Sequence, residues 1–258
     1  MNWIYLSPHL DDAAYSCGGL IWSQTTAGEQ VSVWTICAGD PPEENLSTHA
    51  ASIHDRWNFE NDAVDQRRLE DIESCRILNA SHRHFPIPDA IYRGDFQPKS
   101  TFEGGETEYF YQERDSLFGP LNPAEGKLVK SLSQELLKEI KRVPDSVNTN
   151  IVCPLALGNH VDHQLTRQAV ERLDIPLLYY ADFPYVLDGL DNLDGLRAAG
   201  WRSTSFEINQ DALGAWVAAI AEYKSQLSTF WSDLDEMRCA VDSYRILMGG
   251  AIIWQPPT

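Results

Sequence analysis

The chain opens with the stretch WIYLSPHLDD (residues 3–12), in which an apolar run passes directly into a polar cluster. Residues 3–6 have the aromatic and β-branched content that favours a strand. Pro8 fixes the backbone after them, and the side chains of His9, Asp11 and Asp12 follow at once. Ligands of open α/β sheets bind beyond the carboxyl ends of the strands. The stretch therefore predicts a strand of such a sheet with a site at its end.

Further strand candidates recur between helical stretches. They are short and rich in Val, Ile and Tyr, and they cover residues 31–36, 83–87, 151–155 and 176–180. Short apolar runs separated by helices are typical of a mostly parallel sheet whose two faces are covered.

Helices are indicated by apolar residues at three- and four-residue spacing. Gly18 and Gly19 are expected to allow a tight turn into a first helix over residues 18–26. Apolar faces are expected at Leu69, Ile72, Cys75 and Leu78; at Leu128, Leu132, Leu136 and Ile140; at Val161, Leu165, Ala169 and Leu173; and from Trp216 to Val241. The alternation predicts an α/β fold, a Rossmann-like three-layer sandwich with a mostly parallel sheet and a helical C-terminal region.

A length of 258 residues suits one domain over residues 1–258. Two stretches, near residues 40–61 and 93–125, lack clear periodicity and are rich in polar residues, Gly and Pro. Because long irregular segments in a compact domain are usually functional, we expect them to be loop insertions or lids.

Composition excludes several classes of protein. The formal net charge of −18 argues against nucleic-acid binding, because a negative field repels phosphates. No apolar run is long enough to span a membrane, and the first residues do not resemble a signal peptide, so a cytoplasmic location is expected. The five cysteines are widely spaced without a C-x-x-C pair, which predicts reduced thiols.

A second polar motif, Gly-Asn-His-Val-Asp-His at residues 158–163, follows the strand that begins at residue 151. Asn159 is a good N-cap for a helix starting there. His160 and His163 would then share one face of the first turn, and Asp162 would favour the helix dipole. This motif also lies where a strand ends and a helix begins.

The two motifs together indicate a metal site. Imidazole and carboxylate are both good zinc ligands, and a catalytic zinc normally takes three protein ligands and a water. His9, Asp12 and His163 would fill that set and leave His160 for acid chemistry. Each motif alone also fits a polar helix cap, but two such motifs at strand ends favour Zn²⁺ or another divalent metal.

The residues that carry these motifs resemble the PIG-L/LmbE-like deacetylases, zinc-dependent N-deacetylases that act mostly on N-acetylglucosamine conjugates. The resemblance rests on Ser-Pro-His-Leu-Asp-Asp, Cys17-Gly18-Gly19 and the late His-Val-Asp-His. It extends over most of the chain through Arg67-x-x-Glu70, Pro88-Asp89, Pro154-Leu155 and Asp182-Phe183-Pro184-Tyr185.

The resemblance implies a role for each residue of the two motifs. His9, Asp12 and His163 would bind Zn²⁺, and Asp11 would be the general base. His160 would face the developing oxyanion or the leaving amine, held protonated and oriented by Asp162. The chain departs from the family at Leu10 and Ala13, where Pro and Glu are common, and residues 249–254 lack a Glu that many members carry.

Arg67, Asp89, Trp57 and Phe59 are candidates for substrate binding. Arg67 would hold a phosphate or a hydroxyl, Asp89 would hold sugar hydroxyls, and the two aromatic residues would stack on a sugar ring. The alternatives are an exposed ion pair of Arg67 with Glu70 and local loop packing of the aromatics. Among the remaining histidines, His82 and His84 are expected at the surface or in packing, and His49 and His54 are expected to be solvated in a polar loop.

These observations predict a zinc-dependent N-deacetylase, a hydrolase of linear amide C–N bonds. Its substrate would be a small amino sugar, such as an N-acetylglucosamine conjugate, carrying an N-acetyl or other N-acyl group. A zinc amidase acting on a non-sugar amide stays open, as does a non-catalytic Rossmann-like binding protein, although the G-x-G-x-x-G pattern is absent. A homo-oligomer is possible.

Overall fold

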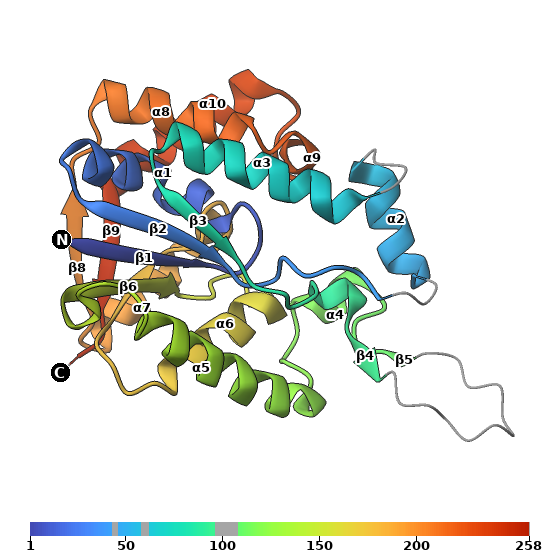
Figure 1. Cartoon of the computed structure of the whole chain (residues 1–258). Helices are drawn as coiled ribbons and strands as arrows, with labels where there is room; N and C mark the ends of the chain where they lie inside the picture. The colour runs from blue at the N-terminus through green and yellow to red at the C-terminus, as the bar shows by residue number, and fades with distance from the viewer. Residues whose placement is uncertain (43–45, 58–61, 96–107, 258) are drawn as a thin grey trace, which may run out of the picture.

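Residues 3–6 lie in β1, an interior strand beside the central strand β6 of a seven-stranded sheet ordered β3-β2-β1-β6-β7-β9-β8 (Figure 1). The computed structural model describes residues 1–42, 46–57, 62–95 and 108–257. The strands of this sheet are β1 (Asn2–Ser7), β2 (Gln30–Thr35), β3 (Ser81–His84), β6 (Thr149–Pro154), β7 (Leu177–Tyr180), β8 (Arg202–Phe206) and β9 (Ala251–Gln255).

The order in which the chain adds strands to the sheet reverses beside β1. The chain runs outward from β1 through β2 to β3, and then returns to β6 on the other side of β1. β1 and β6 pair in parallel, with Ile4 opposite Ile151. Such a reversal of strand order creates the crevice in which α/β sheets bind ligands. The two polar motifs follow these two strands, so they meet at this crevice.

The α/β fold and the mostly parallel sheet are as expected, but β8 and β9 were not predicted. β9 is the buried apolar run Ala-Ile-Ile-Trp, which is too short for its periodicity to separate strand from helix. β8 is an exposed edge strand of sequence Arg-Ser-Thr-Ser-Phe, and no apolar alternation marks it. Both pairings of β9 are antiparallel, with β7 and with β8.

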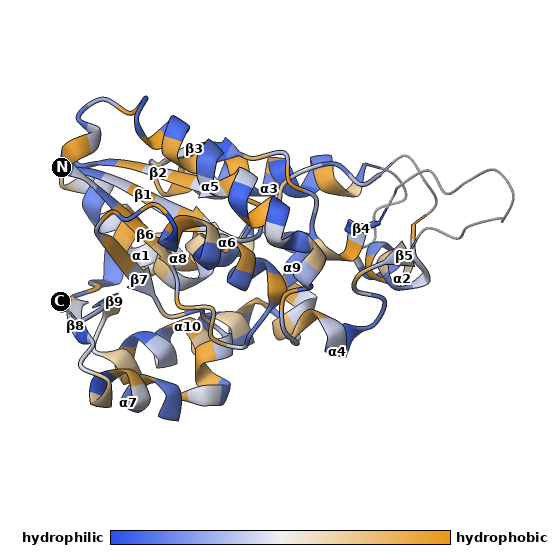
Figure 2. Ribbon diagram, turned by 90° about the horizontal axis from the view of Figure 1, so that it is seen from below, coloured by the Kyte–Doolittle hydropathy of each residue, from blue (hydrophilic) through white to orange (hydrophobic). Residues whose placement is uncertain are grey.

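Helices cover both faces of the sheet and complete the three layers (Figure 1). The upper layer in that view holds α1 (Asp12–Thr26), α3 (Ala63–Ile77), α8 (Gln210–Ala221) and α10 (Leu234–Met248). The lower layer holds α5 (Gly126–Ile140), α6 (Val161–Glu171) and α7 (Asp191–Ala198). Figure 2 shows these helices striped with hydrophilic and hydrophobic residues, as expected where one side of each helix packs on the sheet.

The remaining elements lie around the carboxyl ends of the parallel strands or connect other elements. α2 (Thr48–Trp57) belongs to the first expected insertion, and the second contains β4 (Gly94–Asp95), β5 (Glu108–Tyr109), α4 (Arg114–Leu117) and η2 (Pro123–Glu125). The other short elements are η1 (Ala90–Tyr92), η3 (Ser146–Asn148), η4 (Tyr185–Gly189) and α9 (Lys224–Phe230). Within the described ranges, no helix is long and apolar enough to cross a membrane.

Gly18 and Gly19 lie inside α1 and do not form the expected turn. Their role is close helix packing, because the indole of Trp216 in α8 covers them. A Cβ at Gly18 would lie 2.5 Å from Trp216 Cδ1, and one at Gly19 would lie 2.9 Å from Trp216 Cε3. The Trp216 Nε1–H donates to the carbonyl oxygen of Ala14 at 2.9 Å. Only glycine lets the two helices approach this closely.

The buried face of α3 also differs from the expectation. Leu69 is 57% exposed and Ile72 is 36% exposed, whereas the polar side chains of Arg67 and Asp71 are buried. Arg67 reaches the crevice, and Asp71 accepts a hydrogen bond from the Tyr223 hydroxyl at 2.8 Å. The spacing of apolar residues did not predict the buried face of α3, because that face packs against polar groups.

Candidate functional site

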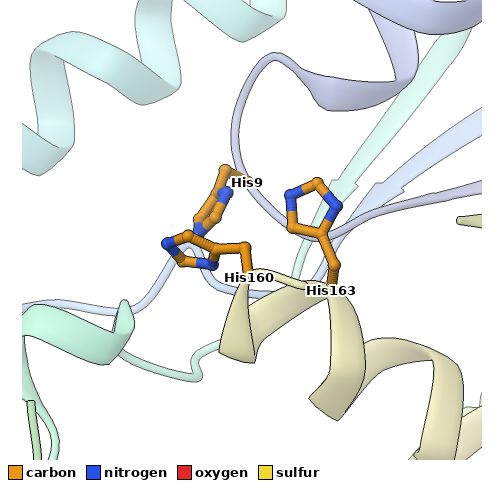
Figure 3. A group of neighbouring side chains, drawn as sticks. All are labelled: His9, His160 and His163. Atoms are coloured by element: carbon orange, nitrogen blue, oxygen red, sulfur yellow. The ribbon is translucent and has the colours of Figure 1, made fainter. Parts of the chain in front are cut away.

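The Asp12 carboxylate lies between two histidines that come from the two motifs. Asp12 Oδ2 is 3.1 Å from His9 Nδ1 and 3.3 Å from His163 Nε2. His9 stands in the loop after β1, and His163 stands in the first turn of α6. Figure 3 shows the rings of His9, His160 and His163 gathered around one space. The pairing of β1 with β6 therefore joins the two motifs, as expected.

Each of these two histidines has its other ring nitrogen bound to a buried carboxylate. His9 Nε2 lies 2.9 Å from Asp162 Oδ2, and His163 Nδ1 lies 2.6 Å from Asp182 Oδ1. Metal-binding histidines almost always donate their second N–H in this way, because the bond orients the ring and raises its basicity. Asp182 follows β7, so the strand-end argument that located the two motifs would have found it too.

The residues fit a divalent metal. In a tetrahedral zinc site with bonds of about 2.0–2.1 Å, neighbouring ligand atoms lie about 3.3–3.4 Å apart, close to the two distances at Asp12. His163 Nε2 is buried and makes no hydrogen bond to any described residue. Three overlapping groups have ligand atoms within 4.8 Å of one another: His9, His160 and His163; His9, Asp11 and Asp12; and His9, Asp89 and Asp162.

The electrostatics of the site favour positive charge at its centre. Burial raises the pKa of Asp12, but the neighbouring His163 and His9 outweigh it and hold the pKa well below the usual range. Burial lowers the pKa of His163, but Asp12 and Asp182 outweigh it and raise the pKa to about 10. The buried carboxylates therefore favour positive charge at this point, which is what a divalent cation would bring.

Asp11 differs from Asp12 in that its carboxylate makes no hydrogen bond to the described residues. It occupies the N-cap position of α1, but its side chain caps no helical N–H. Burial, followed by the adjacent Asp12 charge, raises the pKa of Asp11 to about 7. A carboxylate of this kind, beside a metal site and free of hydrogen bonds to the described residues, has the properties of a general base.

His160 is held as a neutral imidazole. Its Nδ1 accepts the backbone N–H of Asp162 at 3.2 Å, which leaves the proton on Nε2. Burial, followed by the nearby His9, lowers the pKa of His160 well below its usual value. The expectation that the Asp162 carboxylate keeps His160 protonated needs correction. That carboxylate bonds to His9, to Arg93 and to the Ala90 N–H, because α6 directs it toward the β1 side of the crevice.

Arg93 and Glu125 were missed by the sequence analysis. The buried Arg93 guanidinium pairs with Asp162 on one side and with Glu125 on the other. Glu125 also accepts a hydrogen bond from the Tyr111 hydroxyl. A buried chain thus runs from His9 through Asp162 and Arg93 into the second insertion. The spacing of these residues in the sequence does not predict the ion pairs, because the pairs form only when the second insertion folds back over the crevice.

Two of the expected substrate-binding residues line the site, and a third supports them. Arg67 is buried, with Nη1 3.8 Å from Asp89 Oδ2, and the same carboxylate oxygen lies 3.7 Å from His9 Nε2. The alternative, an exposed ion pair of Arg67 with Glu70, is not formed, since Glu70 accepts hydrogen bonds from Ser225. Trp57 is only 6% exposed and lies beneath the Arg67 guanidinium at 4.5 Å, so it holds Arg67 in place. Phe59 falls outside the described residues.

The other histidines have mostly packing roles. His54 is half-buried, stacks on Trp57 and hydrogen-bonds to the Tyr92 hydroxyl, whereas a solvated position was expected. His49 is also half-buried. His84 pairs with the buried Asp71 at 2.7 Å, and His82 is exposed, both consistent with surface or packing roles.

The chain belongs to the PIG-L family, described as GlcNAc-PI de-N-acetylase, whose model matches residues 4–173. It is 29% identical over 205 residues to the 2'-N-acetylparomamine deacetylase of Streptomyces fradiae, covering 76% of this chain and 62% of that enzyme. It is 26% identical over 269 residues to the enzyme of the same name from Niallia circulans, covering 97% of this chain and 89% of that enzyme.

Solved structures share the fold. A zinc-inhibited form of teicoplanin deacetylase Orf2 superposes with a TM-score of 0.77 at 23% sequence identity, covering 98% of this chain and 97% of that chain. At that identity the likeness shows the fold alone, and it includes the seven-stranded, mostly parallel sheet described above.

Proposed function

We propose that the protein is a metal-dependent hydrolase that removes an N-acetyl group from an amino sugar. The observation that carries the proposal is the placement of Asp11, whose carboxylate makes no hydrogen bond to the described residues, beside the His9, Asp12 and His163 cluster. Family membership and the names of the two paromamine deacetylases support the reaction and the amino-sugar substrate.

His9, Asp12 and His163 would hold the metal, with Zn²⁺ the best match to two imidazoles and one carboxylate. When bound there, a divalent metal supplies Lewis acidity, which lowers the pKa of water and polarises an amide carbonyl. Asp162 and Asp182 keep the two imidazoles oriented for this role.

Asp11 would carry out the proton transfers, and His160 would stabilise the developing oxyanion. Asp11 accepts a proton from the water that attacks the amide carbonyl carbon. The Nε2–H of His160 donates a hydrogen bond to the developing oxyanion, a contact of the kind worth about 2.7–4 kcal/mol in the transition state. The carbon–nitrogen bond then breaks, acetate leaves, and the amine takes the proton from Asp11. Arg67 and Asp89 would bind hydroxyl groups of the sugar.

The test is acetate release from a panel of N-acetylated amino sugars, measured with the metal-loaded protein and again after chelation and dialysis. The proposal expects release from amino-sugar acetamides, loss after chelation, and recovery when Zn²⁺ is restored. N-acetylated amino acids and peptides serve as comparison substrates. Preferential hydrolysis of those would favour a non-sugar amidase. Purified protein that binds no divalent ion and releases no acetate would overturn the hydrolase assignment.

A further inference from the structure

A buried row of polar side chains joins His9 to the second insertion, and it is here called the relay: Asp162, Arg93, Glu125 and Tyr111. Each of the four side chains belongs to a residue that is at most 6% exposed. Asp162 lies in α6, whereas the other three belong to the second insertion, next to β4, at the end of η2 and just after β5. Charged groups are rarely buried unless they are paired, so the order of contacts along the relay matters.

Each member of the relay contacts the next. His9 Nε2 lies 2.9 Å from Asp162 Oδ2. The other oxygen of Asp162 accepts a hydrogen bond from Arg93 Nη1, and Arg93 Nε donates to Glu125 Oε1. Glu125 Oε2 accepts the hydroxyl of Tyr111. An uninterrupted line of hydrogen bonds therefore connects the His9 ring to the second insertion.

The charges of the relay do not cancel. Asp162 and Glu125 each bring one negative charge and Arg93 brings one positive charge, so one negative charge remains. The second terminal nitrogen of Arg93, Nη2, is buried and makes no hydrogen bond to the described residues. The guanidinium is thus shared between the two carboxylates. The negative charge that remains favours a cation beside His9, because charges are poorly screened in a buried site.

The contacts alternate between groups that strengthen His9 as a ligand and groups that weaken it. A carboxylate that accepts the second N–H of an imidazole, as Asp162 does for His9, makes the other ring nitrogen a stronger ligand. Arg93 competes for that carboxylate and weakens this effect. Glu125 draws Arg93 away from Asp162, and the Tyr111 hydroxyl draws on the charge of Glu125. Hydrogen bonds in a buried network polarise one another, so these influences reach His9.

We propose that Arg93, Glu125 and Tyr111 set the affinity of the site for its metal, acting through Asp162 and His9. The inference rests on the proposed function, from which it takes His9 as a ligand, and deepens it by naming what regulates the site. The three are positioning residues, because they act on the ring through Asp162. The metal affinity is thus a property of the second insertion as well as of the ligands.

The experiment measures Zn²⁺ affinity by competition with a fluorescent chelator, at one pH, in variants that circular dichroism shows to be folded. Glu125→Gln removes the charge that draws Arg93 away from Asp162, so the affinity should fall about three- to tenfold, less than for loss of a direct partner of a ligand. Tyr111→Phe removes the donor that draws on Glu125, so the affinity should rise about two- to threefold.

Both variants have matched controls outside the site. Glu139 in α5 is also buried and paired with an arginine, Arg83 Nη1, at 2.7 Å. Tyr179 in β7 is also buried and donates its hydroxyl to a carboxylate, that of Glu171 at the end of α6, at 3.0 Å. Glu139→Gln and Tyr179→Phe should therefore bind zinc as the wild type does.

Opposite shifts in the two relay variants support the inference, because loosened packing of the second insertion would weaken zinc binding in both. The inference is overturned if Tyr111→Phe binds zinc no more tightly than Tyr179→Phe. It is also overturned if folded Glu125→Gln binds zinc as tightly as Glu139→Gln. If Glu125→Gln does not fold, the comparison of the two tyrosine variants decides alone.

Acetate release plays no part in this measurement, so the inference and the proposed function can fail separately. Protein that shows the opposite shifts in zinc affinity but releases no acetate would contradict the proposed function and leave the inference standing. Acetate release by protein whose zinc affinity is the same in all variants would do the reverse. Wild-type protein that binds no zinc would overturn the inference whatever its activity.

Discussion

Asp162 and His9 stand 153 positions apart in the sequence, and a contact of 2.9 Å joins Asp162 Oδ2 to His9 Nε2. The contact crosses the boundary between β1 and β6, where the strand order reverses. A ligand candidate from the first motif is thus oriented by a carboxylate from the second. The proposed metal centre therefore depends on both motifs at once.

Asp11→Asn should remove the proton acceptor while preserving the shape and the ligands of the site. We expect turnover to fall by at least about 10²–10⁴-fold, the usual contribution of a general base. Zinc content, measured by atomic emission, should stay at one ion per chain. A metal-loaded Asp11→Asn protein with near-normal acetate release would exclude Asp11 as the base.

His163→Ala should abolish metal binding, because it removes a buried proposed ligand and leaves Asp12 with one histidine. A metal that binds only the folded state stabilises it by about 2.7 kcal/mol at a free concentration of 100 Kd. The melting temperature of the wild type should therefore rise with added Zn²⁺, and that of His163→Ala should not. A stoichiometric zinc ion in the variant would contradict the assignment.

Asp182→Asn should weaken metal binding without removing a ligand. The amide can still accept from His163 Nδ1, but it loses the charge that raises the basicity of the ring. Loss of such an outer partner typically costs about 10–100-fold in metal affinity. Competition with a fluorescent zinc chelator measures the affinity. Asp188→Asn, on the exposed part of η4, is the control and should bind zinc as the wild type does.

Arg93→Met should destabilise the fold strongly, because it leaves the buried Asp162 and Glu125 carboxylates without their shared cation. Breaking a buried ion pair by removing one partner costs about 3–5 kcal/mol. The comparison is Arg76→Met, which breaks an exposed pair with Glu73 and should cost far less, because solvent screens exposed charges. Urea unfolding of both variants gives the two free energies. Similar small losses would show that the buried chain is unimportant for stability.

Gly18→Ala should destabilise the protein by about 1–3 kcal/mol, since its methyl group would overlap the Trp216 indole. Gly214→Ala is the matched substitution in α8, where a Cβ meets nothing within 4 Å. That change should stabilise by about 0.5–1 kcal/mol, because alanine favours a helix more than glycine does. Thermal unfolding of the pair tests whether close helix contact explains the glycines of α1.

The sequence predicted the candidate site where its residues directly follow a strand. His9, Asp11 and Asp12 follow one strand, and His160, Asp162 and His163 follow another, so a rule about strand ends located both groups. The assignment of Asp162 to His160 went wrong because neighbours in sequence on a helix point in different directions. The partner of each side chain is therefore set by the residues across the crevice, as His9 is for Asp162.

Other features lay beyond any local pattern. Arg93 reaches Asp162 only because the second insertion folds back over the crevice. Gly18 resembled a turn residue because the indole that covers it lies about two hundred positions away. β8 shows no periodicity because both of its faces are largely exposed. In each case the structure depends on residues that are distant in the sequence, so neither local spacing nor composition predicts it.

The extent of the family match has a consequence for how this site could be transplanted. The match covers residues 4–173 and includes His9, Asp12 and His163, but Asp182, which contacts His163, lies beyond it. A fragment that ended at residue 173 would keep the three proposed ligands and lose the carboxylate that orients one of them. The smallest transferable unit is therefore longer than the matched segment, and a protein engineer must carry β7 and Asp182 along with the two motifs.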